Sequence, residues 1–315
     1  MSRNEVKVQA VLIAGPTASG KSRLALALAR ETGGTIVNAD SMQVYDGLRL
    51  LTARPSDADL AAAPHRLYGH VPPTAPYSVG LWSREVAPVL AELRAAGKLA
   101  IVCGGTGLYF KALLGNLDAM PEIPPDIRDG LRARMVAEGP EKLYEELQKS
   151  DSESAARIRP QDPQRITRAL EIIAATGRPI GTFRGGGNAP LLDPTRAMKV
   201  VLTPSREALR ERIARRFSAM LTGGAIDEVR RMSEIPGVFE ATAGKAIGLS
   251  ELAAALAGHM TLETATQRAV ARTRQYAKRQ DTFFRHQFDA DWTRLSAPCE
   301  VDVAHLIDRI KEREG

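Results

Sequence analysis

Residues 15–22, Gly-Pro-Thr-Ala-Ser-Gly-Lys-Ser, have the types and spacing of a loop that binds polyphosphate. The pattern G-x-x-x-x-G-K-[ST] lets the backbone bend so that successive N–H groups point into one concavity. Lys21 adds a full positive charge, and Ser22 offers a hydroxyl to a divalent cation. The candidate ligands are Gly15, Pro16, Thr17, Ala18, Ser19, Gly20, Lys21 and Ser22. The motif predicts a loop of the nucleotide-binding type without identifying the polyphosphate.

Asp40 is a candidate for proton transfer. It follows residues 35–39, a short apolar run that predicts a buried strand. In an open parallel sheet, ligands collect at the carboxyl ends of the strands, so we expect Asp40 beside the phosphate loop. The alternative is an aspartate that only caps a turn.

A second predicted strand, residues 98–103, ends in Gly104-Gly105-Thr106-Gly107. ATPases often place a magnesium-holding aspartate after such a strand, whereas this chain has glycines and Thr106. The missing carboxylate indicates a reaction other than nucleotide hydrolysis. The glycines indicate that something large approaches the backbone closely, and we interpret them as walls of a channel in which two substrates meet.

Basic side chains gather in three later segments. Residues 119–197 predict a small helical insertion rich in arginine, including Arg128 and the cluster Gln164-Arg165-Ile166-Thr167-Arg168. The helix expected after a strand at 198–202 carries Arg212, Arg215 and Arg216, of which at least one should be an ordinary surface residue. The helix expected at 262–288 has six Arg and Lys between Arg268 and Arg285 against one acid, Asp281. Its basic residues are candidates for nucleic-acid contacts, and we assign Phe283 and Phe284 to packing.

The elements that must position these residues alternate between strands and helices. The fold class predicted is therefore α/β, a P-loop NTPase-like parallel sheet flanked by helices, with an all-helical insertion. The expected domains are residues 1–118, the first part of the catalytic core; 119–197, the insertion; and 198–315, the second part with the basic helix.

Bulk properties agree with a globular protein acting on a polyanion. The 315 residues are 44% hydrophobic and 25% charged, with a formal net charge of +6. No apolar run has the length of a membrane span, and the first residues lack the apolar core of a signal peptide. The two cysteines, Cys103 and Cys299, fit a reducing compartment, so we expect a cytoplasmic protein. No feature indicates an obligate assembly, and we expect a monomer.

Six motifs occur in an order that resembles the bacterial-type tRNA dimethylallyltransferases, also called tRNA isopentenyltransferases. They are GPTASGKS, NADSMQVY, CGGTGLYFKALL, QRITRALEI, GKAIGL and TRQYAKRQDTFFR, and together they extend from Val8 to Phe288. The resemblance implies transfer of a dimethylallyl group from dimethylallyl diphosphate to N6 of adenine 37 in tRNA, with Mg²⁺ required. It implies a P-loop core and a helical insertion that holds the anticodon stem-loop.

The resemblance also implies residue roles. Residues 15–22 would bind the diphosphate, with Ser22 holding the metal; Asp40 would be the general base; and Thr106 and Arg216 would act at the reacting bond. The implied tRNA contacts are Asp40, Ser41, Met42, Gln43, Arg128, Gln164, Arg165, Ile166, Thr167, Arg168, Lys245, Ala246, Ile247, Gly248, Leu249 and Ser250. At Leu249 and Ser250 this chain departs from the family pattern G-Y-[KR].

Three alternatives remain open on the sequence. A P-loop kinase of a small metabolite or nucleotide explains residues 8–22 and the arginines of the helix that follows 198–202, which could act as a lid, but not the basic helix or the GGTG segment. An adenylate isopentenyltransferase would not need the arginine-rich insertion. A non-catalytic RNA-binding ATPase would hydrolyse ATP and transfer no prenyl group.

Overall fold

The computed structural model describes residues 8–296 and 300–312. Residues 1–7 and Cys299, on which the leader-peptide and cysteine inferences partly depend, lie outside the described residues. The chain divides into two compact units. One consists of residues 1–114 and 190–315 and is called the core unit here; the other consists of residues 115–189 and is called the helical unit.

The core unit is built on a six-stranded sheet with the order β3-β2-β4-β1-β5-β6, in which every pairing is parallel. The strands are β1 (Ala10–Ala14), β2 (Thr35–Asn38), β3 (His65–Arg66), β4 (Ala100–Gly104), β5 (Ala197–Leu202) and β6 (Thr293–Leu295). β1, β2 and β4 are buried along their whole length, which explains their continuous apolar runs. Because β2, β4 and β1 are neighbours, the segments that follow them meet at one edge of the sheet. The predicted α/β fold is confirmed.

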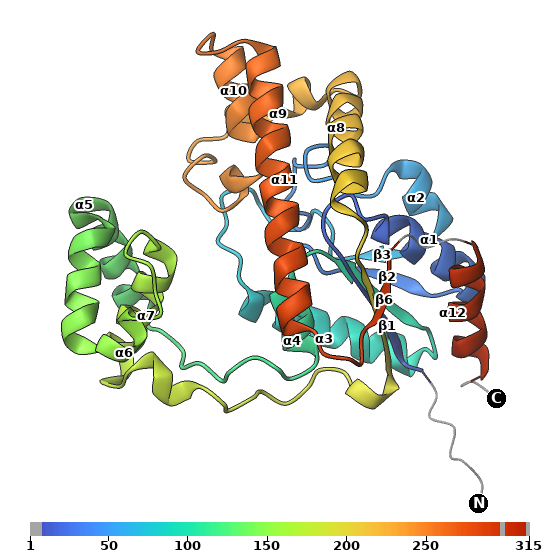
Figure 1. Ribbon diagram of the computed structural model, residues 1–315, viewed down its shortest axis with the longest axis horizontal. Helices are drawn as coiled ribbons and strands as arrows, with labels where there is room; N and C mark the ends of the chain where they lie inside the picture. Colours follow the sequence, from blue (N-terminus) through green and yellow to red (C-terminus); the bar gives the residue numbers. More distant parts are fainter. Residues whose placement is uncertain (1–7, 297–299, 313–315) are drawn as a thin grey trace, which may run out of the picture. The chain divides into compact units, whose positions relative to one another are not determined.

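Helices cover both faces of this sheet (Figure 1). On one face, α1 (Lys21–Thr32) and α12 (Glu300–Glu312) contribute the apolar side chains of Leu24, Leu28 and Leu306. The other face packs against α3 (Val79–Ala95), α4 (Gly107–Leu113) and the end of α11 (Leu262–Gln287). Phe284 of α11 is buried there, and Phe283 packs against the same cluster, which confirms their assignment to packing.

A third apolar cluster of the core unit joins three further helices to α11. These helices are α8 (Arg206–Thr222), α9 (Ala225–Ser233) and α10 (Leu249–Leu256), and the 3₁₀ turn η3 (Ala243–Lys245) belongs to the same cluster. The core unit also contains α2 (Asp57–Ala62) and the 3₁₀ turn η2 (Pro194–Arg196). Phe217, Val229 and Leu252 supply the contacts between α8, α9 and α10. Among residues 8–296 and 300–312, none of the helices has the length and apolar character needed to cross a membrane.

The helical unit contains α5 (Pro125–Ser150), α6 (Ser152–Ala155), α7 (Pro163–Thr176) and the 3₁₀ turn η1 (Ile180–Phe183). The backbone of α5 is non-helical at Gly139, where φ is 80° and Pro140 follows, so a kink divides α5 into two helical segments. Asp162 caps α7 by accepting the N–H of Arg165 at 3.1 Å, and Gly177 ends the helix with φ 67°. Leu143, Ile166 and the rest of a small apolar cluster hold α5 against α7.

Candidate active site

The phosphate loop joins β1 to α1 through two backbone positions in the left-handed region. Gly20 has φ 97° and Ala18 has φ 63°. Gly15 has no room for a side chain, because a Cβ there would lie 2.8 Å from the Ser19 hydroxyl oxygen. The Ser19 hydroxyl is buried and has no hydrogen-bond partner among the described residues. An oxygen-rich anion in the loop would satisfy this donor.

Two cations face the phosphate loop from different helices. The Lys21 ammonium is buried and donates to the Pro16 carbonyl at 3.3 Å. Burial is the main cause that lowers the pKa of Lys21, and Arg216 lowers it further, while the Asp40 carboxylate acts in the opposite direction. The Arg216 guanidinium, on α8, donates to the Thr17 hydroxyl at 2.5 Å. Positive charge is therefore concentrated where a diphosphate would lie.

The neighbouring arginines of α8 differ in what they contact. Arg212 donates to the Ser19 carbonyl at 3.3 Å, so it also lies against the phosphate loop. The Arg215 side chain is 70% exposed and lies 3.7 Å from a carboxylate oxygen of Glu211, one turn earlier on the same helix. Arg215 is thus the ordinary surface residue expected among the three.

Asp40 lies just beyond β2 and is held by its own loop. Its N–H donates to the Asn38 side-chain oxygen at 2.8 Å, and its Oδ1 accepts the N–H of Met42 at 3.0 Å. Thr106, after β4, accepts the N–H of Ser41 at 2.9 Å. These bonds fix the segments that follow β2 and β4 against each other. Asp40 and Thr106 are therefore brought together at the edge where the phosphate loop also lies.

The glycines at the end of β4 and just after it pack closely against other parts of the protein, and their role as channel walls stays a prediction. A Cβ at Gly104 would lie 2.0 Å from the Ala39 backbone. At Gly105 it would lie 2.2 Å from the side-chain nitrogen of Gln280, and at Gly107 it would lie 2.1 Å from the Phe283 ring. The absence of side chains allows Ala39, just after β2, to approach the end of β4, and allows α11 to approach the segment from Gly105 to the start of α4.

Some of the core-unit side chains that are expected to contact tRNA already make hydrogen bonds or apolar contacts within the protein. Gln43 donates to the carbonyls of Thr52 and Ala53, at 2.9 and 3.1 Å. Met42 packs against an apolar cluster. Of the segment 245–250, Lys245 and Ser250 are exposed, Ile247 is partly exposed, and Ala246, Gly248 and Leu249 are buried. Side-chain contacts to a partner are thus available mainly at the two ends of this segment.

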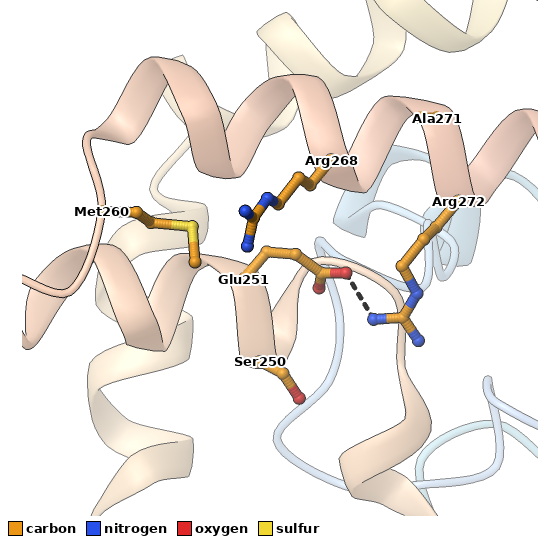
Figure 2. A pocket seen from close by; sticks show the side chains of 6 residues that line it. All are labelled: Ser250, Glu251, Met260, Arg268, Ala271 and Arg272. Carbon is orange, nitrogen blue, oxygen red and sulfur yellow. Dashed lines mark hydrogen bonds and ion pairs between the residues drawn. The ribbon is translucent and has the colours of Figure 1, made fainter.

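A surface pocket of about 450 Å³ adjoins Ser250 on α10 and the first half of α11 (Figure 2). Its lining residues are Ser250, Glu251, Met260, Arg268, Ala271 and Arg272. Glu251 is buried, accepts the N–H of Gly248 at 3.0 Å and forms an ion pair with Arg272. The two arginines outnumber this single carboxylate, so the pocket carries a net positive charge.

In the helical unit, the segment 164–168 presents a mixed surface. Gln164 and Arg165 are exposed, whereas Ile166 belongs to the apolar core. Arg168 lies 3.3 Å from a carboxylate oxygen of Glu171. Arg128 is half-buried and donates to the Ile123 carbonyl at 3.4 Å.

Sequence reasoning does not single out two buried polar residues, of which one contacts the site. Gln280 lies in the middle of a basic helix and contacts the phosphate loop. Glu228, on α9, accepts the backbone N–H groups of Arg49, Leu50 and Leu51 at 2.9, 2.6 and 3.0 Å. Gln280 lies within the TRQYAKRQDTFFR motif and three or four positions from Ala277 and Phe284, but only its partners, distant in sequence, show what it holds, and the same is true of Glu228.

Replacing Glu228 by alanine should destabilise the protein by about 3 kcal/mol, because it leaves buried backbone donors without an acceptor. Urea unfolding at neutral pH measures this change. Glu234→Ala, at the exposed end of the same helix, is the control and should stay close to the unaltered protein. A Glu228→Ala variant as stable as this control would show that water satisfies these three N–H groups.

Comparison with known proteins gives a consistent result. The family model described as IPP transferase matches residues 43–287, and the model described as isopentenyl transferase matches residues 8–70. A tRNA dimethylallyltransferase of Agrobacterium fabrum is 50% identical over 94% of this chain and 99% of its own length. Another, of Rhizobium leguminosarum, is 52% identical over 92% of this chain and 97% of its own length.

Solved structures of the same kind match nearly the whole chain. The tRNA isopentenylpyrophosphate transferase of Bacillus halodurans is 31% identical, with a TM-score of 0.69 over 98% of this chain and 97% of that one. A eukaryotic dimethylallyltransferase acting on tRNA is 26% identical, with a TM-score of 0.77 over 98% of this chain and 77% of that one.

Proposed function

Because the chain belongs to the IPP transferase family, we propose that it transfers a dimethylallyl group from dimethylallyl diphosphate to tRNA, at N6 of adenine 37 in the anticodon stem-loop. The observation that best supports this is the meeting of three strand ends. The phosphate loop after β1, Asp40 after β2 and Thr106 after β4 lie along neighbouring strands. A base and a cradle for the leaving group are thereby placed side by side.

In the proposed reaction the N6 lone pair attacks the first carbon of the dimethylallyl group. A new N–C bond forms, the C–O bond to the diphosphate breaks, and the diphosphate leaves with the electron pair. The N6 amine is a poor nucleophile, since its lone pair is delocalised into the ring, so Asp40 accepts its proton during attack. The loop N–H groups, Lys21 and Arg216 stabilise the charge that grows on the leaving group.

A magnesium ion fits this site if the diphosphate supplies most of its ligands. Ser22 is exposed in the first turn of α1, where its hydroxyl is available. Within the described part of the chain, no group of three or more His, Cys, Asp or Glu side chains is arranged to hold a metal ion. Magnesium commonly takes one or two protein oxygens together with substrate phosphates and water, which matches this donor set. Held through Ser22, the ion would neutralise charge on the departing diphosphate.

We further propose that the basic residues of α11, Lys245, and the exposed residues of 164–168 bind the RNA backbone. Adenine 37 must leave its stack to reach Asp40, which costs a few kcal/mol, and phosphate contacts elsewhere can offset that cost. We expect the protein to act as a monomer in the cytoplasm, where its tRNA substrate is found.

Binding of an anticodon stem-loop should weaken steeply with salt, because each phosphate contact releases a counterion. With about six contacts, affinity falls about 10³-fold between 50 and 200 mM salt. Filter binding across a KCl series measures the slope. If the affinity did not change with salt, neither α11 nor the helical unit would be part of the RNA interface.

Parallel assays with different substrates distinguish the proposed function from the alternatives. The protein is incubated with labelled dimethylallyl diphosphate and either unmodified tRNA or AMP, and in parallel with ATP in the presence and absence of RNA. We expect label in tRNA only, with no ATP hydrolysis. Label in AMP would identify an adenylate isopentenyltransferase, and RNA-stimulated ATP hydrolysis without prenyl transfer would identify an RNA-binding ATPase.

A further inference from the structure

Gln280 connects two segments of the active site through a single side chain. Its Oε1 accepts the N–H of Thr17, in the phosphate loop, at 2.8 Å. Its Nε2 donates to the carbonyl of Gly105, at the end of β4, also at 2.8 Å. A backbone N–H only donates and a carbonyl only accepts, so the two partners fix the orientation of the amide.

If packing were the only role of residue 280, its buried surroundings would favour an apolar side chain there. It is 5% exposed, and Ala277 and Phe284, one turn away on either side along α11, are buried apolar residues. Positions three and four apart share one face of a helix, and this face of α11 is buried: Ala277 packs against Leu209 and Ile213 of α8, and Phe284 packs against the sheet. Burying an amide without hydrogen bonds is costly. The two bonds to the phosphate loop and to β4 offset that cost.

Gly105 leaves the space that the Gln280 amide occupies. A Cβ at this position would lie 2.2 Å from Gln280 Nε2 and 3.3 Å from Asp40 Oδ2. The amide and the candidate base therefore lie around the same point at the end of β4. Any side chain at residue 105 would push Gln280 away from its carbonyl partner.

We propose that Gln280 is a positioning residue for prenyl transfer, which holds the phosphate loop in register with the strand ends that carry Asp40 and Thr106. This inference rests on the proposed function. The leaving group is bound after β1, whereas the base follows β2 and is tied to β4. Gln280 supplies a direct bond between these two halves. Without it, diphosphate still binds, but the allylic carbon and the amine lose their alignment.

The effect of removing Gln280 should fall on turnover more than on binding. Gln280→Met keeps the volume and the apolar character of the helix face but makes neither hydrogen bond. Because a displacement of about 1 Å can cost about 10² in rate, we expect kcat to fall about 100-fold. The Kd for inorganic pyrophosphate, measured by calorimetry, should change by less than about tenfold, since the remaining loop N–H groups, Lys21 and Arg216 are intact.

The test is a double-mutant cycle between residues 105 and 280 with prenylation of tRNA as the assay. We expect Gly105→Ala and Gln280→Ala each to lower kcat about 100-fold, and the double variant to be about as active as either single one, because the two residues form one interaction. Gln267→Ala, on the exposed part of α11 before its basic stretch, is the control and should keep the activity of the unaltered protein.

Three results would overturn the proposal. The first is an unchanged kcat in Gln280→Met, and the second is a double variant whose loss of kcat equals the product of the two single losses. The third is a loss of kcat that is fully explained by a matching loss of thermal stability or of pyrophosphate affinity. Failure of the proposed function is seen separately, because the unaltered protein would then transfer no prenyl group. In that case the pyrophosphate titration still reports on the phosphate loop.

Discussion

Asp40→Asn lowers kcat for tRNA prenylation by about 10³ and leaves tRNA affinity nearly unchanged, as expected for loss of a general base, whose contribution is typically about 10²–10⁴. Asparagine suits this test better than alanine. Its side-chain oxygen still accepts the N–H of Met42, which the Asp40 carboxylate now accepts at 3.0 Å. The loop after β2 therefore keeps its shape while the proton acceptor is lost. Single-turnover prenylation and filter binding measure the two effects separately.

Asp46→Asn is the matched control for this experiment. Asp46 lies on the same loop and also accepts a backbone N–H, that of Gly47, at 2.7 Å, but it is exposed. Asp46→Asn should retain turnover within about twofold, since a surface substitution of this kind changes little. If Asp40→Asn stays within several-fold of the unaltered enzyme, the base is another group and the assignment fails.

Arg216→Ala lowers kcat/KM for dimethylallyl diphosphate by about 10²–10³, the usual effect of removing one group that stabilises developing negative charge. The guanidinium lies against the phosphate loop, where it donates to the Thr17 hydroxyl. Half-buried beside Lys21, it acts in surroundings where charge is poorly screened by water. Initial rates across a series of diphosphate concentrations at saturating tRNA measure the effect.

The adjacent residue provides the control. Arg215 has the same charge and lies on the same helix, but its side chain is 70% exposed and faces Glu211. Arg215→Ala should keep kcat/KM within about twofold, because exposed ion pairs contribute little. Equal losses in the two variants would show that the net charge of α8, and not a specific contact of Arg216, supports catalysis.

The parts of the site that depend on local sequence could be predicted. The phosphate loop follows from the spacing of two glycines, Lys21 and Ser22, and its place between a strand and a helix follows from the apolar run before it and the helical pattern after it. Asp40 could be placed at the same edge because ligands in parallel sheets collect at strand ends. Both inferences need only neighbouring residues and a general rule of topology.

The long-range contacts of the site and of the core could not be predicted, because their partners are far apart in the chain. Gln280 and Thr17 are separated by 263 positions, and Glu228 and Leu50 by 178. A polar residue within a helix is predicted to lie on the surface unless the element that packs against it is known. The glycines after β4 were correctly associated with a close approach, but the approaching groups are Ala39, Gln280 and Phe283. The two-residue strand β3 is too short to leave a periodic pattern.

The position of the transferred group tests the central claim most directly. Unmodified tRNA is treated with the enzyme and dimethylallyl diphosphate, digested with ribonuclease, and its fragments are sequenced by mass spectrometry. The account predicts that only the adenosine at position 37 gains the mass of a single dimethylallyl group, with release of one equivalent of diphosphate. It also predicts that tRNA with guanine at this position gains no dimethylallyl group. Prenylation at another nucleotide, or RNA that leaves the reaction unchanged, would contradict it.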